Sequence, residues 1–365
     1  MILMDNKTWL VSIILLNYNW KQFNSDCIDS ILKQTYHDYE IIFVDNKSTD
    51  WSLEDVEKCY KKEIESWKIK IVKNCENLWF AWWNNSWVRE SSKDSKYIWL
   101  LNNDTVIEKD CLLELVKWIE SDSSLWWVCS VILDKWSEDK IEKKILDWNV
   151  FIMNAFWLQI REKATEKNKV YYTNFLSWCS LLYKKSIIDE PFLDVYKIYA
   201  EDMQLSWELL LKWYKLWVCK ESKVHHFWSA TMNKVPYTKI YLNARNLFIN
   251  YYVFLSKKTR LKLIIPFLTL HFLQFIPNYK IFRKLLKAKL NAIFWINRNK
   301  KTVDMVRNRI NEWRKVSEKE LLSTMTYKLA WDDLHSNKFK LFLINILNII
   351  NKCYYLIFLI PFRNE

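Results

Sequence analysis

Glycine is absent from all 365 residues of this sequence. At the usual frequency of about 7%, a chain of this length would hold about 25 glycines. Tryptophan, ordinarily among the rarest residues, occurs 23 times. It stands in polar turns at Trp20, Trp51 and the pair Trp82-Trp83, where proteins favour a residue without a Cβ because it tolerates positive φ and close backbone approach. We therefore interpret most tryptophans as glycine positions, as translation of a reassigned UGA codon would produce.

The alternative is a truly Trp-rich chain that dispenses with glycine, which few folds accommodate. Trp99 and Trp207 are the leading candidates for genuine tryptophans, because each lies inside a predicted regular element rather than a turn. UGG codons at the turn positions of the gene would contradict the interpretation.

Two other features are missing. The eight cysteines form no CxxC pair and have no short regular spacing, which argues against a zinc site or a disulfide framework and favours reduced thiols in the cytosol. No signal peptide is visible, because Asp5, Asn6 and Lys7 interrupt any apolar run at the start of the sequence. We expect a cytoplasmic protein.

The composition bounds the class of protein. Hydrophobic residues make up 51% of the chain, which excludes a disordered protein and allows a substantial core. The net charge of +13 indicates an anionic partner such as nucleic acid, phospholipid or nucleotide phosphate. No RNA- or DNA-binding motif is present, so we expect no nucleic-acid partner.

The first half alternates short β-branched runs with amphipathic stretches, which predicts an α/β sheet flanked by helices. Ligands of such sheets bind beyond the carboxyl ends of the strands, and polar clusters follow several of the predicted strands. The predicted strands are residues 10–16, 40–44, 68–73 and 97–101, and the predicted helices are residues 27–34 and 84–91.

The character changes near residue 237, so we predict one domain over residues 1–236 and a helical region over residues 237–365. Residues 257–315 hold 16 Lys and Arg against two acidic residues. A last apolar stretch, residues 339–362, carries asparagine at every third position from Asn345 to Asn351, which is too polar for a spanning helix. Either segment alone also fits a soluble helical appendage. Together with the basic excess they favour peripheral association with a membrane surface.

When tryptophan is read as glycine at the turns, the chain contains VSIILLNYNG, YEIIFVDNKSTDGS, NLGFAGGNNSG, LLNNDT and AEDMQLS in that order. This succession resembles the family 2 glycosyltransferases, and within them the rhamnosyltransferase-like branch. The resemblance covers residues 9 to about 250. It implies a GT-A fold, a Rossmann-like mixed sheet flanked by helices, and transfer of a sugar from a nucleoside diphosphate.

The resemblance assigns the donor contacts to polar residues at the strand ends. It implies that Asp45 binds the base. The other residues expected to contact the donor are Asn17, Asn19, Asn46, Asn84, Asn85, Asn102 and Asn103. An Asx-rich turn, or a loop that caps a helix, would leave the same pattern.

Asn102-Asn103-Asp104 occupies the place of the family's DxD motif and keeps only its last carboxylate. A hard divalent cation on a diphosphate needs one or two carboxylates together with water, which Asp104 can supply. By resemblance, His226 adds a late contact to the metal or the diphosphate, so we expect Mg²⁺ or Mn²⁺ as cofactor. A helix N-cap at Asp104 and a structural histidine at 226 are the alternatives.

Glu201-Asp202 opens a helical stretch. By resemblance Asp202 is the general base that deprotonates the acceptor hydroxyl and Glu201 supports it, because a single displacement with inversion requires one base opposite the leaving group. Acidic residues also occupy first helical turns for reasons of the helix dipole alone.

The sequence thus predicts an inverting glycosyltransferase, with rhamnose as a candidate sugar and a cell-surface glycan or lipid-linked molecule as acceptor, at the inner face of the cell membrane. A sugar-nucleotide-forming nucleotidyltransferase is one alternative, although the Gly-rich basic loop expected after its first strand is missing. A non-catalytic protein that binds anionic surfaces is the other. Its basic residues would be expected near the polar strand ends, whereas they cluster after Lys257.

Overall fold

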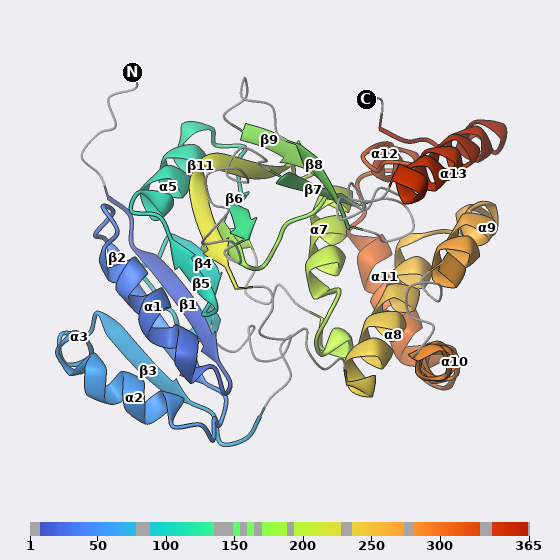
Figure 1. Cartoon of the computed structure of the whole chain (residues 1–365). Helices are drawn as coiled ribbons and strands as arrows, with labels where there is room; N and C mark the ends of the chain where they lie inside the picture. Colours follow the sequence, from blue (N-terminus) through green and yellow to red (C-terminus); the bar gives the residue numbers. More distant parts are fainter. Residues whose placement is uncertain are drawn as a thin grey trace.

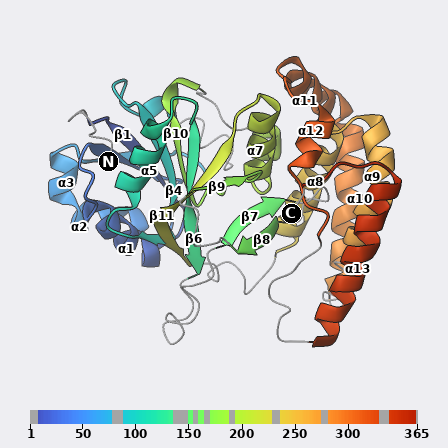
Figure 2. The ribbon, with the colours of Figure 1, turned by 90° about the horizontal axis from the view of Figure 1, so that it is seen from above.

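The computed structural model describes residues 8–77, 88–134, 149–153, 159–163, 170–187, 193–227, 236–273, 281–328 and 338–363. A nine-stranded sheet lies on one side of the molecule and a group of helices on the other, with α7 between them (Figures 1 and 2). The sheet has the order β3-β2-β1-β4-β10-β6-β11-β5, and β9 pairs with β11.

The first half of the sheet is parallel. Its strands are β1 (Val11–Asn17), β2 (Tyr39–Asp45), β3 (Ile69–Lys73) and β4 (Tyr97–Asn102). β1, β2 and β4 are buried and consist of near-continuous apolar runs, whereas β3, at the edge of the sheet, is mostly half-buried. The sequence pattern located all four to within about two residues. The parallel register places Asn17 beside Asp45 at one edge of the sheet.

The second half of the sheet is mixed. β10 (Ser180–Lys184) runs antiparallel to both β4 and β6 (Trp127–Asp134), and β11 (Leu216–His226) runs parallel to β6. β5 (Thr105–Ile107) and β9 (Val170–Thr173) each pair antiparallel with β11, while β7 (Asn149–Met153) and β8 (Gln159–Lys163) form a separate hairpin. The predicted mixed α/β fold is confirmed.

Four helices accompany the first half of the chain: α1 (Lys21–Leu32), α2 (Ser52–Cys59), α3 (Lys61–Glu65) and α5 (Cys111–Ser121). The helix predicted at residues 27–34 is α1, which begins six residues earlier and ends two residues earlier. Of the helix predicted at 84–91, residues 84–87 lie outside the described residues and residues 88–90 are helical. Two short 3₁₀ turns, η1 (Lys185–Ile187) and η2 (Asp194–Tyr196), follow β10.

α7 (Glu201–Leu211) is buried along nearly its whole length, between the sheet and the C-terminal helices. Those helices are α8 (Tyr237–Phe254), α9 (Lys257–Leu273), α10 (Phe282–Arg298), α11 (Lys300–Glu312), α12 (Glu318–Ser323) and α13 (Lys338–Ile357). Over the described residues, none of the helices is both long and apolar enough to span a bilayer.

Tryptophan occupies two kinds of environment. Trp99, Trp127 and Trp207 are fully buried in the core, and the Nε1–H of Trp99 donates to Ser180 Oγ at 2.9 Å. Trp67 and Trp213, by contrast, have φ of 61° and 78° and side chains that are 77% and 64% exposed. The second group has the left-handed backbone that favours glycine.

Candidate active site

The end of β1 is tied to the end of β2 by a buried network of amides. Asn17 Nδ2 donates to Asp45 Oδ1 at 2.8 Å, and Asn17 Oδ1 accepts from Asn24 at 2.9 Å and from Asn103 at 3.3 Å. Asn103 also donates to Asn24 Oδ1 at 2.7 Å. Asn17 has no exposed surface and Asn103 very little, and their hydrogen bonds hold the loops at the strand ends together.

Asp45 is equally enclosed. Its second carboxylate oxygen accepts from the backbone N–H of Ser48 at 3.0 Å, which fixes the turn after β2. The neighbouring Asn46 donates to Asn77 Oδ1 at 2.7 Å and accepts from Asn74 at 3.0 Å. Both oxygens of the Asp45 carboxylate are thus hydrogen-bonded at the strand ends, and its contact with a base stays a prediction.

Asn19 lies on the exposed side of the same turn. It has φ of 57°, a conformation that asparagine adopts more readily than most residues, and its Oδ1 accepts from the backbone N–H of Thr49 at 2.7 Å. Asn84 and Asn85, the other predicted donor contacts, lie outside the described residues.

Asp104 and His226 meet although 122 residues separate them in the sequence. β5 and β11 pair antiparallel with Thr105 opposite His226, and His226 Nε2 lies 3.2 Å from Asp104 Oδ1. The backbone N–H of Phe227 donates to the Asp104 carbonyl at 3.0 Å, which fixes the turn further. The two predicted metal-binding side chains are thus adjacent, and both are partly exposed.

The turn at Asn102 is also fixed from β10. The backbone N–H of Asn102 donates to the Cys179 carbonyl at 3.1 Å, and Thr105 Oγ1 donates to the Asn102 carbonyl at 2.6 Å. Cys179 precedes β10 directly, so the loop that leads into β10 lies against the Asn102–Asp104 turn. The side chain of Asn102 is half-buried.

Glu201 and Asp202 form the first turn of α7, as predicted. Burial, followed by the charge of Asp202, raises the pKa of Glu201 well above the ordinary carboxyl range, and burial raises the pKa of Asp202 in the same direction. Asp202 Oδ1 accepts from the backbone N–H of Met203 at 2.8 Å. Within the described residues Glu201 Oε2 has no hydrogen-bond partner. A carboxyl group with a raised pKa can take up a proton near neutral pH.

A row of hydrogen-bonded polar side chains along the buried side of α7 was not predicted from the sequence. Gln204 Nε2 donates to Glu208 Oε2 at 2.7 Å, and Lys212 Nζ donates to Glu208 Oε1 at 2.9 Å. The i, i+4, i+8 spacing is visible in the sequence and could have identified it. Gln204 and Lys212 thus both donate to the buried carboxylate of Glu208, which gives Gln204 a structural role.

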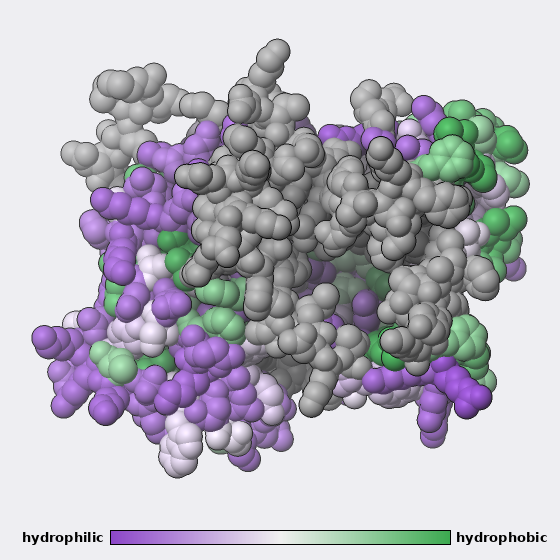
Figure 3. Space-filling model, viewed as in Figure 1, coloured by the Kyte–Doolittle hydropathy of each residue, from purple (hydrophilic) through white to green (hydrophobic). Residues whose placement is uncertain are grey.

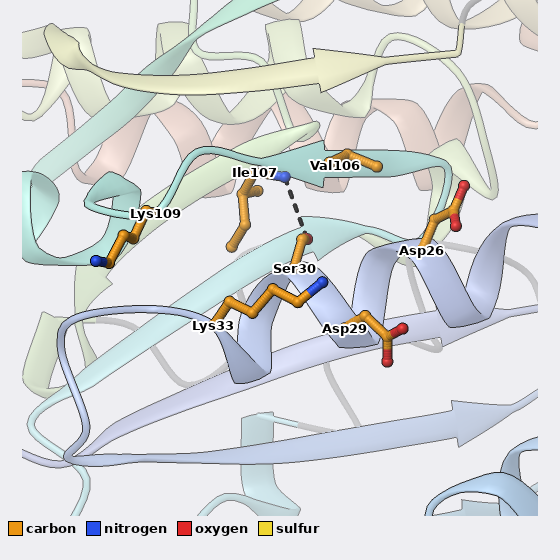
Figure 4. A pocket seen from close by; sticks show the side chains of 7 residues that line it. All are labelled: Asp26, Asp29, Ser30, Lys33, Val106, Ile107 and Lys109. Carbon is orange, nitrogen blue, oxygen red and sulfur yellow. Dashed lines mark hydrogen bonds between the residues drawn. The ribbon is translucent and has the colours of Figure 1, made fainter.

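A surface pocket of about 600 Å³ lies between α1 and β5 (Figure 4). Its wall includes a hydrogen bond from the Ile107 N–H to Ser30 Oγ at 3.2 Å. None of the predicted site residues lines it, so it is separate from the strand-end residues. Its lining residues are Asp26, Asp29, Ser30, Lys33, Val106, Ile107 and Lys109.

Comparison with known proteins assigns the class. The model of the family described as "Glycosyl transferase family 2" matches residues 12–192. The chain is 25% identical over 256 residues to an uncharacterized glycosyltransferase of Haemophilus influenzae, which covers 64% of this chain and 75% of that protein.

Two solved structures share the fold. S. aureus TarS 1–349 in complex with UDP-GlcNAc has a TM-score of 0.54 at 15% identity, covering 93% of this chain and 88% of that chain. GalNAc-T7 with UDP, GalNAc and Mn²⁺ has a TM-score of 0.55 at 14% identity over 68% of this chain, which spans about half of that chain's length (49%). Residues 12–192 match the family 2 glycosyltransferases, and the protein is a transferase.

Proposed function

We propose that the protein transfers a sugar, with inversion, from a nucleoside diphosphate to a hydroxyl group of a cell-surface glycan or lipid-linked acceptor. The observation that carries this proposal is the place of Asp202 in the first turn of the buried helix α7, where burial also raises its pKa. The acceptor oxygen would bond to the anomeric carbon as the bond to the diphosphate breaks, and Asp202 would take the hydroxyl proton. Glu201, buried beside it, would support Asp202.

Asp104 and His226 fit a divalent cation bound to the diphosphate. They offer one carboxylate oxygen and one imidazole nitrogen 3.2 Å apart, and phosphate oxygens and water would complete the coordination. No cluster of three or more His, Cys, Asp or Glu side chains suited to a metal occurs in the described part of the chain, which agrees with a metal held jointly by protein and substrate. Bound Mg²⁺ or Mn²⁺ would neutralise the departing diphosphate.

UDP is the first nucleotide to test, because TarS and GalNAc-T7 were both solved with UDP or a UDP sugar. Rhamnose, from the rhamnosyltransferase-like motifs, is a second sugar to include in the screen. A nucleotidyltransferase would release pyrophosphate, whereas the proposed reaction releases a nucleoside diphosphate.

The experiment is a screen of donor sugars read by release of nucleoside diphosphate, with the wild-type chain and two variants. Asp202→Asn should lower turnover by about 10² to 10⁴ and leave donor binding intact, because only the proton acceptor is removed. Asp94→Asn, on an exposed loop, is the matched control and should behave as wild type. Full turnover by Asp202→Asn would remove Asp202 from its role.

We also propose that α9, α10 and α13 rest on an anionic bilayer at the cytoplasmic face of the membrane. α9 and α10 carry Lys and Arg, α13 carries Lys, and none of the three contains Asp or Glu. They lie together on the side remote from β1–β3, where Figure 3 shows apolar residues gathered along one edge. The exposed apolar side chains of α9 and α13 include Leu261, Ile265, Leu268, Phe342, Ile349, Ile350, Leu356 and Ile357.

The orientation of α13 supports this proposal. Asn351 is buried and donates to the Tyr327 carbonyl, so part of the predicted asparagine stripe faces the protein. Ile349 and Ile350 face outwards and are 63% and 59% exposed. α13 is tied to α9 by Lys262, whose Nζ donates to the Phe358 carbonyl at 2.8 Å. An apolar surface ringed by lysines matches an anionic lipid headgroup layer.

The tryptophans with positive φ support the proposal that several stand for glycine. Trp213 comes directly after Lys212, the C-cap residue of α7, in the position where helices commonly end on glycine. Its N–H donates to the Leu210 carbonyl at 3.1 Å, and the Tyr214 N–H donates to the Leu209 carbonyl at 3.0 Å. Trp51, with φ of 64°, precedes α2 in the same left-handed region. Trp20 has φ of −122°, which any residue adopts, so its assignment rests on the motif alone.

A further inference from the structure

The six residues that lead into Glu201 have an unusual backbone. Lys197, Tyr199 and Ala200 have φ of 60°, 72° and 60°, although none is glycine. The Ile198 N–H donates to the Tyr196 carbonyl at 2.7 Å around Lys197, which closes a tight γ-turn with positive φ. A residue with this backbone conformation is strained and persists only where the surrounding structure holds it. Something must therefore hold this loop.

Side chains of α8 hold it. Asn246 Nδ2 lies within hydrogen-bond distance of three loop carbonyls, those of Tyr196 at 2.7 Å, Ile198 at 2.9 Å and Tyr199 at 2.6 Å. One Arg245 nitrogen, Nη2, donates to the carbonyls of Val195 at 2.8 Å and Tyr196 at 2.9 Å. Five of the contacts from the two side chains thus end on the backbone of this one loop.

A third side chain of α8 extends the contact to both ends of the loop. The Tyr196 hydroxyl donates to Asn250 Oδ1, and Asn250 Nδ2 lies 3.5 Å from the carbonyl of Ala200, the residue before Glu201. Ala200 is the N-cap of α7. Asn250 therefore contacts the residue at which α7 begins.

These side chains are deeply buried, which makes their polar contacts consequential. Asn246 and Asn250 have no exposed surface and Arg245 is 2% exposed, with its guanidinium 4.7 Å from the Trp295 ring centroid. Arg245 also donates to Asn246 Oδ1 at 2.8 Å, which orients the asparagine amide towards the loop. Removing a buried donor leaves its carbonyl partners unsatisfied, so each contact strongly favours this one loop conformation.

We propose that Asn246, oriented by Arg245 and assisted by Asn250, is a positioning residue that sets the place of Asp202 for proton transfer. The inference rests on the proposed function, in which Asp202 is the base. It gives α8 a part in the reaction, since the strained loop that α8 holds ends where α7 starts. Release of the loop would move Asp202 while leaving the strand-end residues in place.

The test compares Asn246→Ala with Asn243→Ala, an asparagine on the exposed side of the same helix. We expect turnover to fall by about 100-fold in Asn246→Ala with the KM for donor changed by less than about twofold, because small displacements of a reacting group cost about that much. Amide hydrogen exchange at residues 197–203 should quicken in the same variant. Asn243→Ala should match wild type in all three measurements.

Two milder variants keep the proposal testable if Asn246→Ala does not fold. Tyr196→Phe removes only the hydroxyl that donates to Asn250, and should lower turnover without loss of the thermal transition. Arg245→Lys retains a cationic donor and should keep more turnover than Arg245→Met.

The outcomes separate the two proposals. If Asp202→Asn is inactive but folded Asn246→Ala or Tyr196→Phe turns over at the wild-type rate, the positioning role is overturned and the proposed function stands. If KM for donor rises together with the fall in turnover and exchange quickens throughout the protein, the role of Asn246 is structural only. Full activity of Asp202→Asn would instead overturn the proposed function.

Discussion

His226 Nε2 lies 3.2 Å from Asp104 Oδ1 because β5 and β11 pair with Thr105 opposite His226. The preceding residue of β11, His225, lies beside Glu108 instead, with its Nε2 3.3 Å from Glu108 Oε1. Alternation along the strand sends these two histidines to opposite faces of the sheet. Only His226 shares the face of the predicted diphosphate site, which makes His225 a matched control for it.

The Asp104–His226 pair leads to a prediction about metal dependence. Asp104→Asn should weaken activation by Mn²⁺ or Mg²⁺ by about tenfold or more and His226→Gln less, because the charged oxygen is the harder ligand. A titration of turnover against metal concentration after treatment with a chelator measures it. His225→Gln should leave the titration unchanged. Equal metal activation in Asp104→Asn and wild type would contradict the assignment.

The pH dependence of turnover follows from the carboxyl groups of α7. Burial raises the pKa of Asp202 above its ordinary value of about 4, and the base must be deprotonated to act. Turnover should therefore rise with pH along a limb centred well above pH 4, measured as kcat at saturating donor. A limb centred near pH 4 would show that the acting base is a solvated carboxylate.

The stability of the protein should respond to pH in the opposite sense. Glu201 has a raised pKa in the folded state, so between about pH 4 and that pKa the folded state binds more protons than the unfolded state, and the free energy of unfolding falls as pH rises. Glu201→Gln should remove this decline and be relatively more stable at pH 8 than at pH 5. Denaturant unfolding at the two pH values measures the difference. An equal fall in the free energy of unfolding from pH 5 to pH 8 in the variant and in wild type would contradict the prediction.

Binding to lipid should depend on the outward side of α13. Ile349→Ser with Ile350→Ser should lower the fraction of protein that floats with phosphatidylglycerol vesicles by about tenfold, since two exposed aliphatic side chains that would enter the lipid surface are lost. Met305→Ser, an exposed apolar residue of α11 next to Asp304, is the control.

Phosphatidylcholine vesicles should bind little of any variant. Binding that is equal for both lipids, or unchanged by the double substitution, would contradict the proposal. A change in oligomeric state caused by the double substitution would assign the face to a second copy of the chain instead.

The suspected glycine positions predict a gain in stability. Trp213→Gly should raise the free energy of unfolding by about 1 kcal/mol, because the left-handed region costs residues with a Cβ about that much. Trp313, which ends α11 with φ of −101°, is the control and should gain nothing on substitution. An equal gain at both positions, or tryptophan found at 213 in peptides of the native protein, would contradict the glycine interpretation.

The sequence by itself determined the sheet and the order of the chemistry along it. Apolar runs of five to seven residues form buried strands, so β1, β2 and β4 lie where the pattern predicted them. The start of a helix at Glu201-Asp202 has an equally local cause, because the apolar residues that follow this pair recur at helical spacing. Neither prediction depends on a distant contact.

Only the tertiary structure decided how the polar residues are used. Asn17 and Asn19 look alike in sequence, yet one is enclosed by Asn24 and Asn103 and the other lies on an exposed turn. The meeting of Asp104 with His226 needs the pairing of β5 with β11, and the loop before Glu201 needs Asn246 of α8. Periodicity reports which face of an element is apolar, but hydrogen bonds between distant segments are set by packing, which the local pattern does not contain.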